Sequence, residues 1–219
     1  MSEYRIPSGP GEAEFSEKRS RFLGHVRMVE SEEEARAFIA EMKKEYYDAR
    51  HNCWCYSIKD GPERYSDDGE PQGSAGLPML EVLRRRGVTN AVCVVTRYFG
   101  GVLLGTGGLL RAYTRSASDA LDAAGVSQVR RWRETSIDCS YAQAEKRKGE
   151  IAAAGGTVSE VAYGAAVTLR VLVPEELAES FRDRIFDLSA GSVEVRYTGE
   201  CFRAVPLQEE SVLKNAFRK

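Results

Sequence analysis

The chain has 219 residues, which exceeds one average domain and favours two small ones. Its 42% hydrophobic and 29% charged residues are typical of a globular protein and exclude a disordered, collagenous or disulfide-rich scaffold. The 31 basic and 33 acidic residues give a net charge of −2, which excludes general attraction to nucleic acid, so an anionic partner must be bound locally.

The cysteines and the N-terminal sequence indicate the redox state and the cellular compartment of the protein. Five cysteines form no framework of pairs, so we expect them to be reduced. The N-terminus lacks a basic segment followed by an apolar one, and the longest apolar run, Ala91–Val95, is far too short to cross a membrane. We therefore expect a soluble, cytoplasmic protein without a membrane partner.

The first half of the chain alternates strand and helix patterns. We expect the first 13 residues to be loose, because they are rich in Gly, Pro and Glu. Ser31 and Glu34 form a capping-box pair at the start of a helix. The turn Asp67-Asp68-Gly69 follows a short strand, and Gly87 ends a second helix. The patterns predict strands at 21–29, 52–58, 64–66 and 88–98, and helices at 31–47 and 76–86.

A glycine-rich loop follows the most apolar strand. Gly100–Gly108 holds five glycines in nine residues, and apolar residues then recur at helical spacing up to Gly125. After a boundary near 126–131, the pattern restarts in the order βαββαβ, which is the ferredoxin-like signature. We therefore predict an α+β protein with an N-terminal domain at 1–128 and a C-terminal ferredoxin-like domain at 129–219. The expected C-terminal elements are strands at 135–139, 157–163, 167–173 and 192–202, and helices at 141–154 and after Pro174.

The glycine loop predicts an anion site. Backbone N–H groups without side-chain obstruction suit an anion at a helix N-terminus, and two arginines add donors. The alternative is that the glycines only allow tight turns and close packing. The loop lacks the Lys-Ser/Thr ending of a Walker P-loop and does not match GxGxxG, so neither a magnesium nucleotide nor NAD follows. The candidate residues for an anion or nucleic acid are Arg97, Tyr98, Gly100, Gly101, Gly105, Gly107, Gly108 and Arg111.

A second candidate site combines the strand at 52–58 with the acidic turn. Asp67, Asp68 and Glu70 offer oxygens for a divalent cation or a general base, or they only form a turn and cap backbone N–H groups. We assign no metal and no cofactor. His51 shares a strand face with Cys53 and Cys55, while Asn52 points to the other face. Residues two apart on a strand are too distant for a Cys–His pair, so packed cysteines are favoured over a nucleophile.

Several linked motifs, in this order, resemble the YigZ/IMPACT family in its bacterial two-domain form. The likeness extends from about Lys18 to Gly125. Its motifs are His51-Asn52-Cys53, Asp67–Pro71, Ser74-Ala75-Gly76, Arg97–Gly101, Leu104–Leu109 and Arg111-Ala112-Tyr113.

The resemblance implies a fold for each domain and a role in translation. The first domain would have the left-handed βαβ fold of ribosomal protein S5 domain 2-like proteins, which GHMP kinases and domain IV of elongation factor G share. The second would resemble domain V of that factor. Eukaryotic relatives look like regulators of translation that act through protein partners, but they carry a different accessory domain.

Together these observations favour a non-enzymatic regulatory protein linked to translation. It would bind RNA or the ribosome through the glycine-rich loop, with a protein partner in translation control as a further possibility. The alternative is an enzyme for a small phosphorylated or nucleotide substrate, with the carboxylates and His51 as acid–base groups.

Overall fold

The computed structural model describes residues 3–207 of this mixed α+β protein, whose described sheets contain antiparallel strand pairs. The chain folds into two compact units. One contains the residues up to Gln128 together with the end of the last strand from Ala204, and the other is Val129–Arg203. None of the helices within 3–207 has the length and apolar composition that crossing a bilayer requires.

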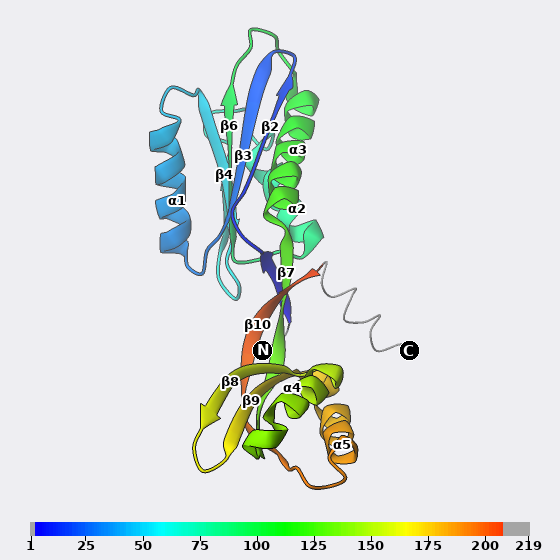
Figure 1. Ribbon diagram of the computed structural model, residues 1–219. Helices are drawn as coiled ribbons and strands as arrows, with labels where there is room; N and C mark the ends of the chain where they lie inside the picture. Colours follow the sequence, from blue (N-terminus) through cyan, green and yellow to red (C-terminus); the bar gives the residue numbers. More distant parts are fainter. Residues whose placement is uncertain (1–2, 208–219) are drawn as a thin grey trace. The chain divides into compact units, whose positions relative to one another are not determined.

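The first unit is built on an antiparallel sheet with helices on both faces (Figure 1). The strand order is β2-β3-β6-β4-β5. Apolar β6 lies in the middle, as its unbroken burial requires, because a strand covered on both faces has no solvent-facing side. The strands are β2 (Gly11–Glu17), β3 (Ser20–Met28), β4 (His51–Ser57), β5 (Glu63–Ser66) and β6 (Ala91–Tyr98).

The three helices of this unit bury opposite faces of the sheet. α1 (Glu32–Glu45) packs on one face, and α2 (Gly76–Arg86) and α3 (Thr106–Ala124) pack on the other, as Figure 1 shows. The alternation in β4 matches this division. Cys53 and Cys55 belong to the core under α2 and α3, whereas Tyr56 belongs to the core under α1. The expected division of β4 into two faces is therefore confirmed.

Helix ends follow their sequence signals. The Ser31 hydroxyl accepts the N–H of Glu34, and the Glu34 carboxylate accepts the N–H of Glu30 rather than that of Ser31. The capping box is thus present with its second arm shifted by one residue. Gly87 ends α2 with φ 64°, in the left-handed region that favours glycine.

The expectation of a loose N-terminus is wrong for most of its length. Tyr4–Pro7 forms β1, and β2 begins at Gly11. The backbone of β2 lies so close to α3 that a Cβ at Gly11 would stand 2.2 Å from the carbonyl oxygen of Ala120. The alternation of Ala13 and Phe15, which both pack against the core, is the strand signal that the Gly, Pro and Glu content concealed.

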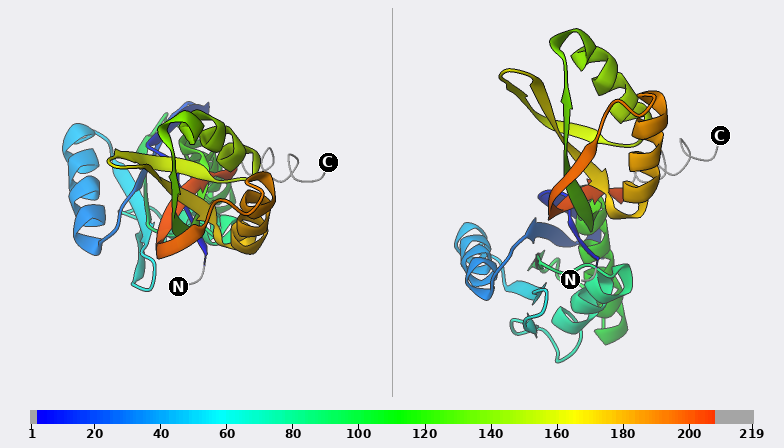
Figure 2. Two further views of the ribbon diagram at one scale, coloured as in Figure 1. Left: turned by 60° about the horizontal axis from the view of Figure 1, so that its bottom comes forward. Right: turned by 90° about the horizontal axis from the view of Figure 1, so that it is seen from below.

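The second unit follows the predicted element order of strand, helix, two strands, helix and strand. Its sheet runs β8-β9-β7 with β10 beside β7, and Figure 2 shows both helices against one face. β7 begins nine residues earlier than predicted, at Val126 instead of Thr135, so the expected connection at 126–131 is strand. The elements are β7 (Val126–Cys139), α4 (Ala144–Ala153), β8 (Thr157–Tyr163), β9 (Val167–Pro174), α5 (Ala178–Leu188) and β10 (Val195–Pro206).

Candidate functional site

A cleft of about 480 Å³ opens in the first unit where the glycine loop meets the acidic turn. It brings the two candidate sites of the sequence together, because His51 and Glu70 line it beside Arg97 and Gly105. The full lining is Arg50, His51, Gly69, Glu70, Pro71, Arg97, Phe99, Leu103, Leu104, Gly105, Thr106 and Leu109.

A buried ion pair forms one wall of the cleft. Arg97 Nη1 donates to Glu70 Oε1 at 2.6 Å, and their side chains are only 6% and 3% exposed. The Tyr113 hydroxyl donates to the same oxygen at 2.8 Å, and burial raises the pKa of Tyr113, so the phenol keeps its proton. Arg97, which the sequence predicts as an anion donor, is therefore buried and paired with Glu70 while it lines the cleft. Its Nη2 also reaches the Ser20 hydroxyl, and only its buried Nε lacks a partner.

His51 presents one ring nitrogen to this wall. Its Nδ1 lies 2.9 Å from the carbonyl oxygen of Asp68. A carbonyl only accepts hydrogen bonds, so Nδ1 carries the hydrogen in this contact. Nε2 is 3.9 Å from Glu70 Oε1. The backbone thus fixes the ring, and His51 lines the cleft beside Glu70.

The other groups of β4 are structural. Asn52 is buried and points away from His51, accepting the Thr96 hydroxyl and donating to the carbonyl of Tyr46. The Cys53 thiol donates to the carbonyl of Asp67, and burial raises the pKa of this thiol. A protonated thiol is a poor nucleophile, which agrees with the packed-cysteine interpretation.

The acidic turn is occupied by structural hydrogen bonds. Asp67 Oδ1 accepts the N–H groups of Ala75 and Gly76 at 3.0 and 2.9 Å, and its Oδ2 accepts that of Gly73 at 2.8 Å. Asp67 thereby caps α2, whose own N-cap residue has no capping side chain.

Asp68 connects three segments around the same turn. Its Oδ2 accepts the N–H of Asn52 at 2.8 Å, and its Oδ1 binds Lys43 Nζ at 2.6 Å. Over residues 3–207, no group of three or more His, Cys, Asp or Glu side chains is arranged to hold a metal ion. Of the two interpretations of the turn, these contacts favour turn formation and capping.

The glycine loop presents its backbone with little obstruction. Gly100 is closely packed, because a Cβ there would stand 2.0 Å from the carbonyl of Arg19. Gly101 and Gly105 have φ of 82° and 75° with open space around them, and Gly107 meets only the end of Arg111, whereas Gly108 packs against Leu104. The loop glycines therefore divide into packing positions and open positions.

α3 begins at this loop without a cap. Its N-cap is Gly105, which has no capping side chain, and its first turn holds no acidic residue. The N–H groups of a helix's first turn have no partner within the helix and carry the positive end of its dipole. Gly105 and Thr106 line the cleft, so this positive end lies at the cleft beside Arg97 and His51.

Exposed cations border the loop. A second hollow of about 250 Å³, lined in part by Lys18, Leu104, Gly108 and Arg111, also adjoins it, and Arg50 lines the cleft. Arg19 adjoins Gly100. Within residues 3–207, no ion pair or hydrogen bond involves the side chains of Lys18, Arg19, Arg50 or Arg111. These four residues are called the loop cations below.

The sequence missed three of the loop cations, and the reason is geometric. Lys18 and Arg19 form the two-residue turn between β2 and β3 with φ of 46° and 65°, a conformation that glycine or asparagine normally provides. Two such residues in succession store strain, and strain of this kind concentrates at functional sites. Arg50 precedes β4 with no distinguishing motif. Tyr98, a predicted residue, donates to Asp48 and is half-buried.

Comparisons with known proteins match both units. The Impact N-terminal domain model matches residues 18–121, and a domain of unknown function, DUF1949, matches 137–192. "IMPACT family member YvyE" of Bacillus subtilis is 37% identical over 188 residues, covering 85% of this chain and 87% of that protein. "IMPACT family member YigZ" of Escherichia coli is 35% identical, covering 89% and 98%. A solved structure, titled as the crystal structure of a hypothetical protein, is 34% identical with a TM-score of 0.57, covering 90% and 98%.

Proposed function

The chain belongs to the IMPACT family, and from this premise we propose that it is a translation-linked regulatory protein that binds RNA, free or in the ribosome, through its glycine-rich loop. The observation that carries the proposal is the uncapped start of α3 between the loop cations. Phosphates suit both elements, because backbone N–H groups and arginine or lysine side chains are the usual donors to nucleic-acid backbones.

The apolar tip of the same loop supports a macromolecular partner. Leu103 is 81% exposed, and Phe99 and Val102 are also exposed on the segment that joins β6 to α3. Single-stranded RNA is held by aromatic side chains on which bases stack, together with cations that follow the backbone. The chain as a whole has a net charge of −2, whereas the loop cations give this loop a local positive charge.

Fold assignments belong to the same proposal. We assign the first unit to the left-handed βαβ fold of ribosomal protein S5 domain 2-like proteins, and the second to the ferredoxin-like fold, similar to domains IV and V of elongation factor G. The βαββαβ order and the strand order β8-β9-β7-β10, with both helices on one face, support the second assignment.

Salt-dependent binding tests the RNA proposal. Ribosome co-sedimentation and titration with single-stranded RNA, each at low and moderate salt, should show association that weakens as salt rises, because bound cations release counterions from the RNA. Lys18→Ala with Arg111→Ala should lower the slope of log K against log salt by about one for each RNA phosphate that the variant leaves without its cation.

The matched control is Lys44→Ala with Arg85→Ala, two exposed cations of the same unit that lie away from the loop. It should leave the slope unchanged. Association that is absent at every salt concentration, or an equal loss in both double variants, would contradict the proposal. Arg97→Ala is unsuitable as a probe, because Arg97 is part of the buried ion pair.

A second candidate function is favoured by one observation, the orientation of His51. In its neutral form, an imidazole that lines a cleft beside a helix N-terminus could act as a base toward a small phosphorylated or nucleotide substrate. A thermal-shift screen of nucleotides and sugar phosphates with and without Mg²⁺ tests it. A ligand at 100 times its Kd stabilises by about 2.7 kcal/mol. Stabilisation of the wild type that His51→Asn removes would favour the enzyme over the RNA-binding protein.

A further inference from the structure

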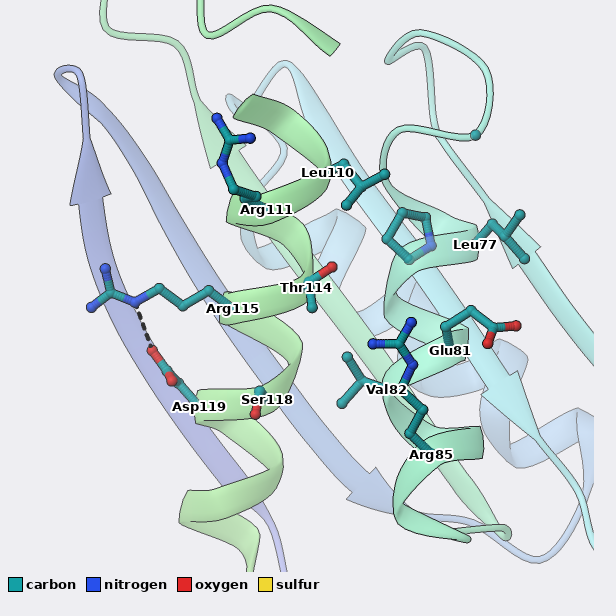
Figure 3. A pocket seen from close by; sticks show the side chains of 12 residues that line it. Leu77, Glu81, Val82, Arg85, Leu110, Arg111, Thr114, Arg115, Ser118 and Asp119 are labelled. Carbon is teal, nitrogen blue, oxygen red and sulfur yellow. Dashed lines mark hydrogen bonds and ion pairs between the residues drawn. The ribbon is translucent and has the colours of Figure 1, made fainter. Parts of the chain in front are cut away.

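A groove of about 570 Å³ runs between α2 and α3, on the side of these helices that faces away from the sheet. Figure 3 shows Leu110, Thr114 and Ser118 along one side of α3, facing the residues of α2. Thr114 and Ser118 are small, so the two helices leave a depression instead of closing over it. The lining is Gly73, Leu77, Pro78, Glu81, Val82, Arg85, Leu110, Arg111, Thr114, Arg115, Ser118 and Asp119.

The floor of the groove is apolar and partly open to solvent. Leu110 of α3 is 46% exposed and Leu77 of α2 is half-buried, whereas Pro78 and Val82 line the groove but are buried. Larger apolar residues of both helices, such as Met79 and Tyr113, are already used in the core beneath them. Leu110 and Leu77 therefore keep apolar surface that the core of this unit does not use, and exposed apolar surface of this kind can mark an interaction site.

The charge around the floor is not balanced. Glu81 is paired with Arg84, and Asp119 is paired with Arg115, so neither carboxylate is available to the remaining arginines. Arg85 on α2 and Arg111 on α3 have no ion pair or side-chain hydrogen bond within residues 3–207. Two unpaired guanidinium groups thus border an apolar strip. Charge complementarity calls for an occupant with an apolar face and carboxylates beside it.

We propose that this groove docks an acidic amphipathic helix of a partner protein. Both walls are helices, so the groove offers no unpaired strand edge to which an extended peptide could add. A helix with apolar residues at i, i+4 and i+7 lays one stripe along such a groove, and carboxylates on its flanks reach Arg85 and Arg111. The lining of α3 from Leu110 to Ser118 is about two helical turns long, enough to contact two or three successive residues of that stripe.

The test uses a defined probe. A stapled helical peptide with leucine at i, i+4 and i+7 and glutamate on both flanks is titrated into the full-length protein and followed by fluorescence anisotropy and backbone NMR. Two sibling peptides carry glutamine or lysine in place of glutamate. We expect saturable binding of the acidic peptide, with shift changes at Val82, Leu110 and Thr114, and weaker binding of both siblings. Arg85→Glu should weaken the acidic peptide roughly tenfold or more.

Arg85 is chosen because it lies outside the loop cations, so the variant should leave RNA binding intact and the two proposals fail independently. Lys44→Glu, a charge reversal on α1 outside the groove, is the matched control and should leave the Kd unchanged. Equal binding of the acidic and lysine peptides, equal effects of the two variants, or no shift changes in the groove at millimolar peptide would overturn the proposal.

A parallel titration uses dodecanoate, a small amphiphile, in place of the peptide. If it saturates the groove with dependence on Arg85 while the peptide does not, the site is one for small amphiphiles and the helix-docking proposal is wrong.

Discussion

The two loops that border the cleft differ in what their polar groups bind. In the acidic turn, Asp67 and Asp68 accept backbone N–H groups or a lysine, and Glu70 accepts Arg97 and Tyr113. In the glycine loop, the first turn of α3 has no cap, and the cations around it have no acidic partner in the described part of the chain. The turn's charges are satisfied within the fold, whereas the donors of the loop remain open to a ligand.

This difference separates two kinds of charged residue that look alike in a sequence. Buried polar groups must be paired within the protein, because an unpaired one loses its water without compensation. Exposed donors carry no such requirement and are free for a partner. Substitutions in the acidic turn should therefore act on stability, and substitutions at the glycine loop should act on binding.

Arg97→Ala should give the largest effect, a loss of about 3–5 kcal/mol in the free energy of unfolding, because it leaves the Glu70 carboxylate buried without its cation. Urea denaturation measures this loss. The double variant Glu70→Leu with Arg97→Leu removes both charges and should be more stable than Arg97→Ala alone. A variant Arg97→Ala that is as stable as the wild type, with only RNA binding reduced, would instead restore the prediction that Arg97 is a surface anion donor.

Asp67→Ala should have the next largest effect. It removes the acceptor of three backbone N–H groups at the start of α2, which should lower the free energy of unfolding by about 1–3 kcal/mol. Asp67→Asn keeps one acceptor oxygen and should recover part of the loss. Stability unchanged in both variants, together with lost ligand binding or activity, would show that the carboxylate works on a ligand instead of capping the helix.

The sequence was sufficient for features set by local patterns. Periodicity and caps located α1, α2 and α3 and the strands β3 to β6 within a few residues, because apolar spacing and cap residues act over one or two turns. The N-terminal strands were missed. Gly11 is explained only by its approach to the backbone of α3, a contact between distant parts of the chain.

The candidate site was predictable in only some of its members, and the roles of these residues were not. The sequence named Arg97, Glu70 and His51, yet nothing local indicates that Arg97 turns inward to Glu70 while Arg111 stays exposed. The sequence does not predict the turn at Lys18 and Arg19, because it lacks the glycine or asparagine by which such turns are recognised. Pairing and exposure depend on tertiary packing, and spacing along a chain does not encode them directly.

Gly107→Ala tests the glycine loop, and its expected effect on the free energy of unfolding is smaller. Gly107 lies in the first turn of α3, and an added Cβ would meet only the end of Arg111 at 3.7 Å, so alanine should stabilise the protein by about 0.5–1 kcal/mol. The added methyl group should also obstruct the N–H groups of the loop and weaken RNA binding. Gly149→Ala in α4, where a Cβ meets nothing within 4 Å, is the matched control. It should stabilise similarly without changing RNA binding, and equal RNA binding by both variants would assign Gly107 no part in the site.

The smallest expected effect is a pH dependence of stability that comes from His25 on β3, a buried side chain away from the cleft. His25 Nε2 is buried without a partner, and Nδ1 is 3.8 Å from a Glu12 carboxylate oxygen. Burial lowers the pKa of His25 below its ordinary value of 6.5, Glu12 and Glu45 oppose this shift, and Arg27 adds to it. The unfolded chain therefore binds a proton more readily than the folded one. The contribution of His25 to stability is fully present above about pH 6.5 and is lost as the pH falls through the lower folded pKa.

Urea denaturation of the wild type and His25→Gln at several pH values between about 5 and 7.5 measures this contribution. Carboxylates that titrate in both proteins cancel in the difference between their free energies of unfolding. The wild type should lose stability relative to the variant on acidification, and a difference that stays constant or changes in the opposite direction would show that the imidazole accepts its proton in the folded state as readily as in the unfolded chain.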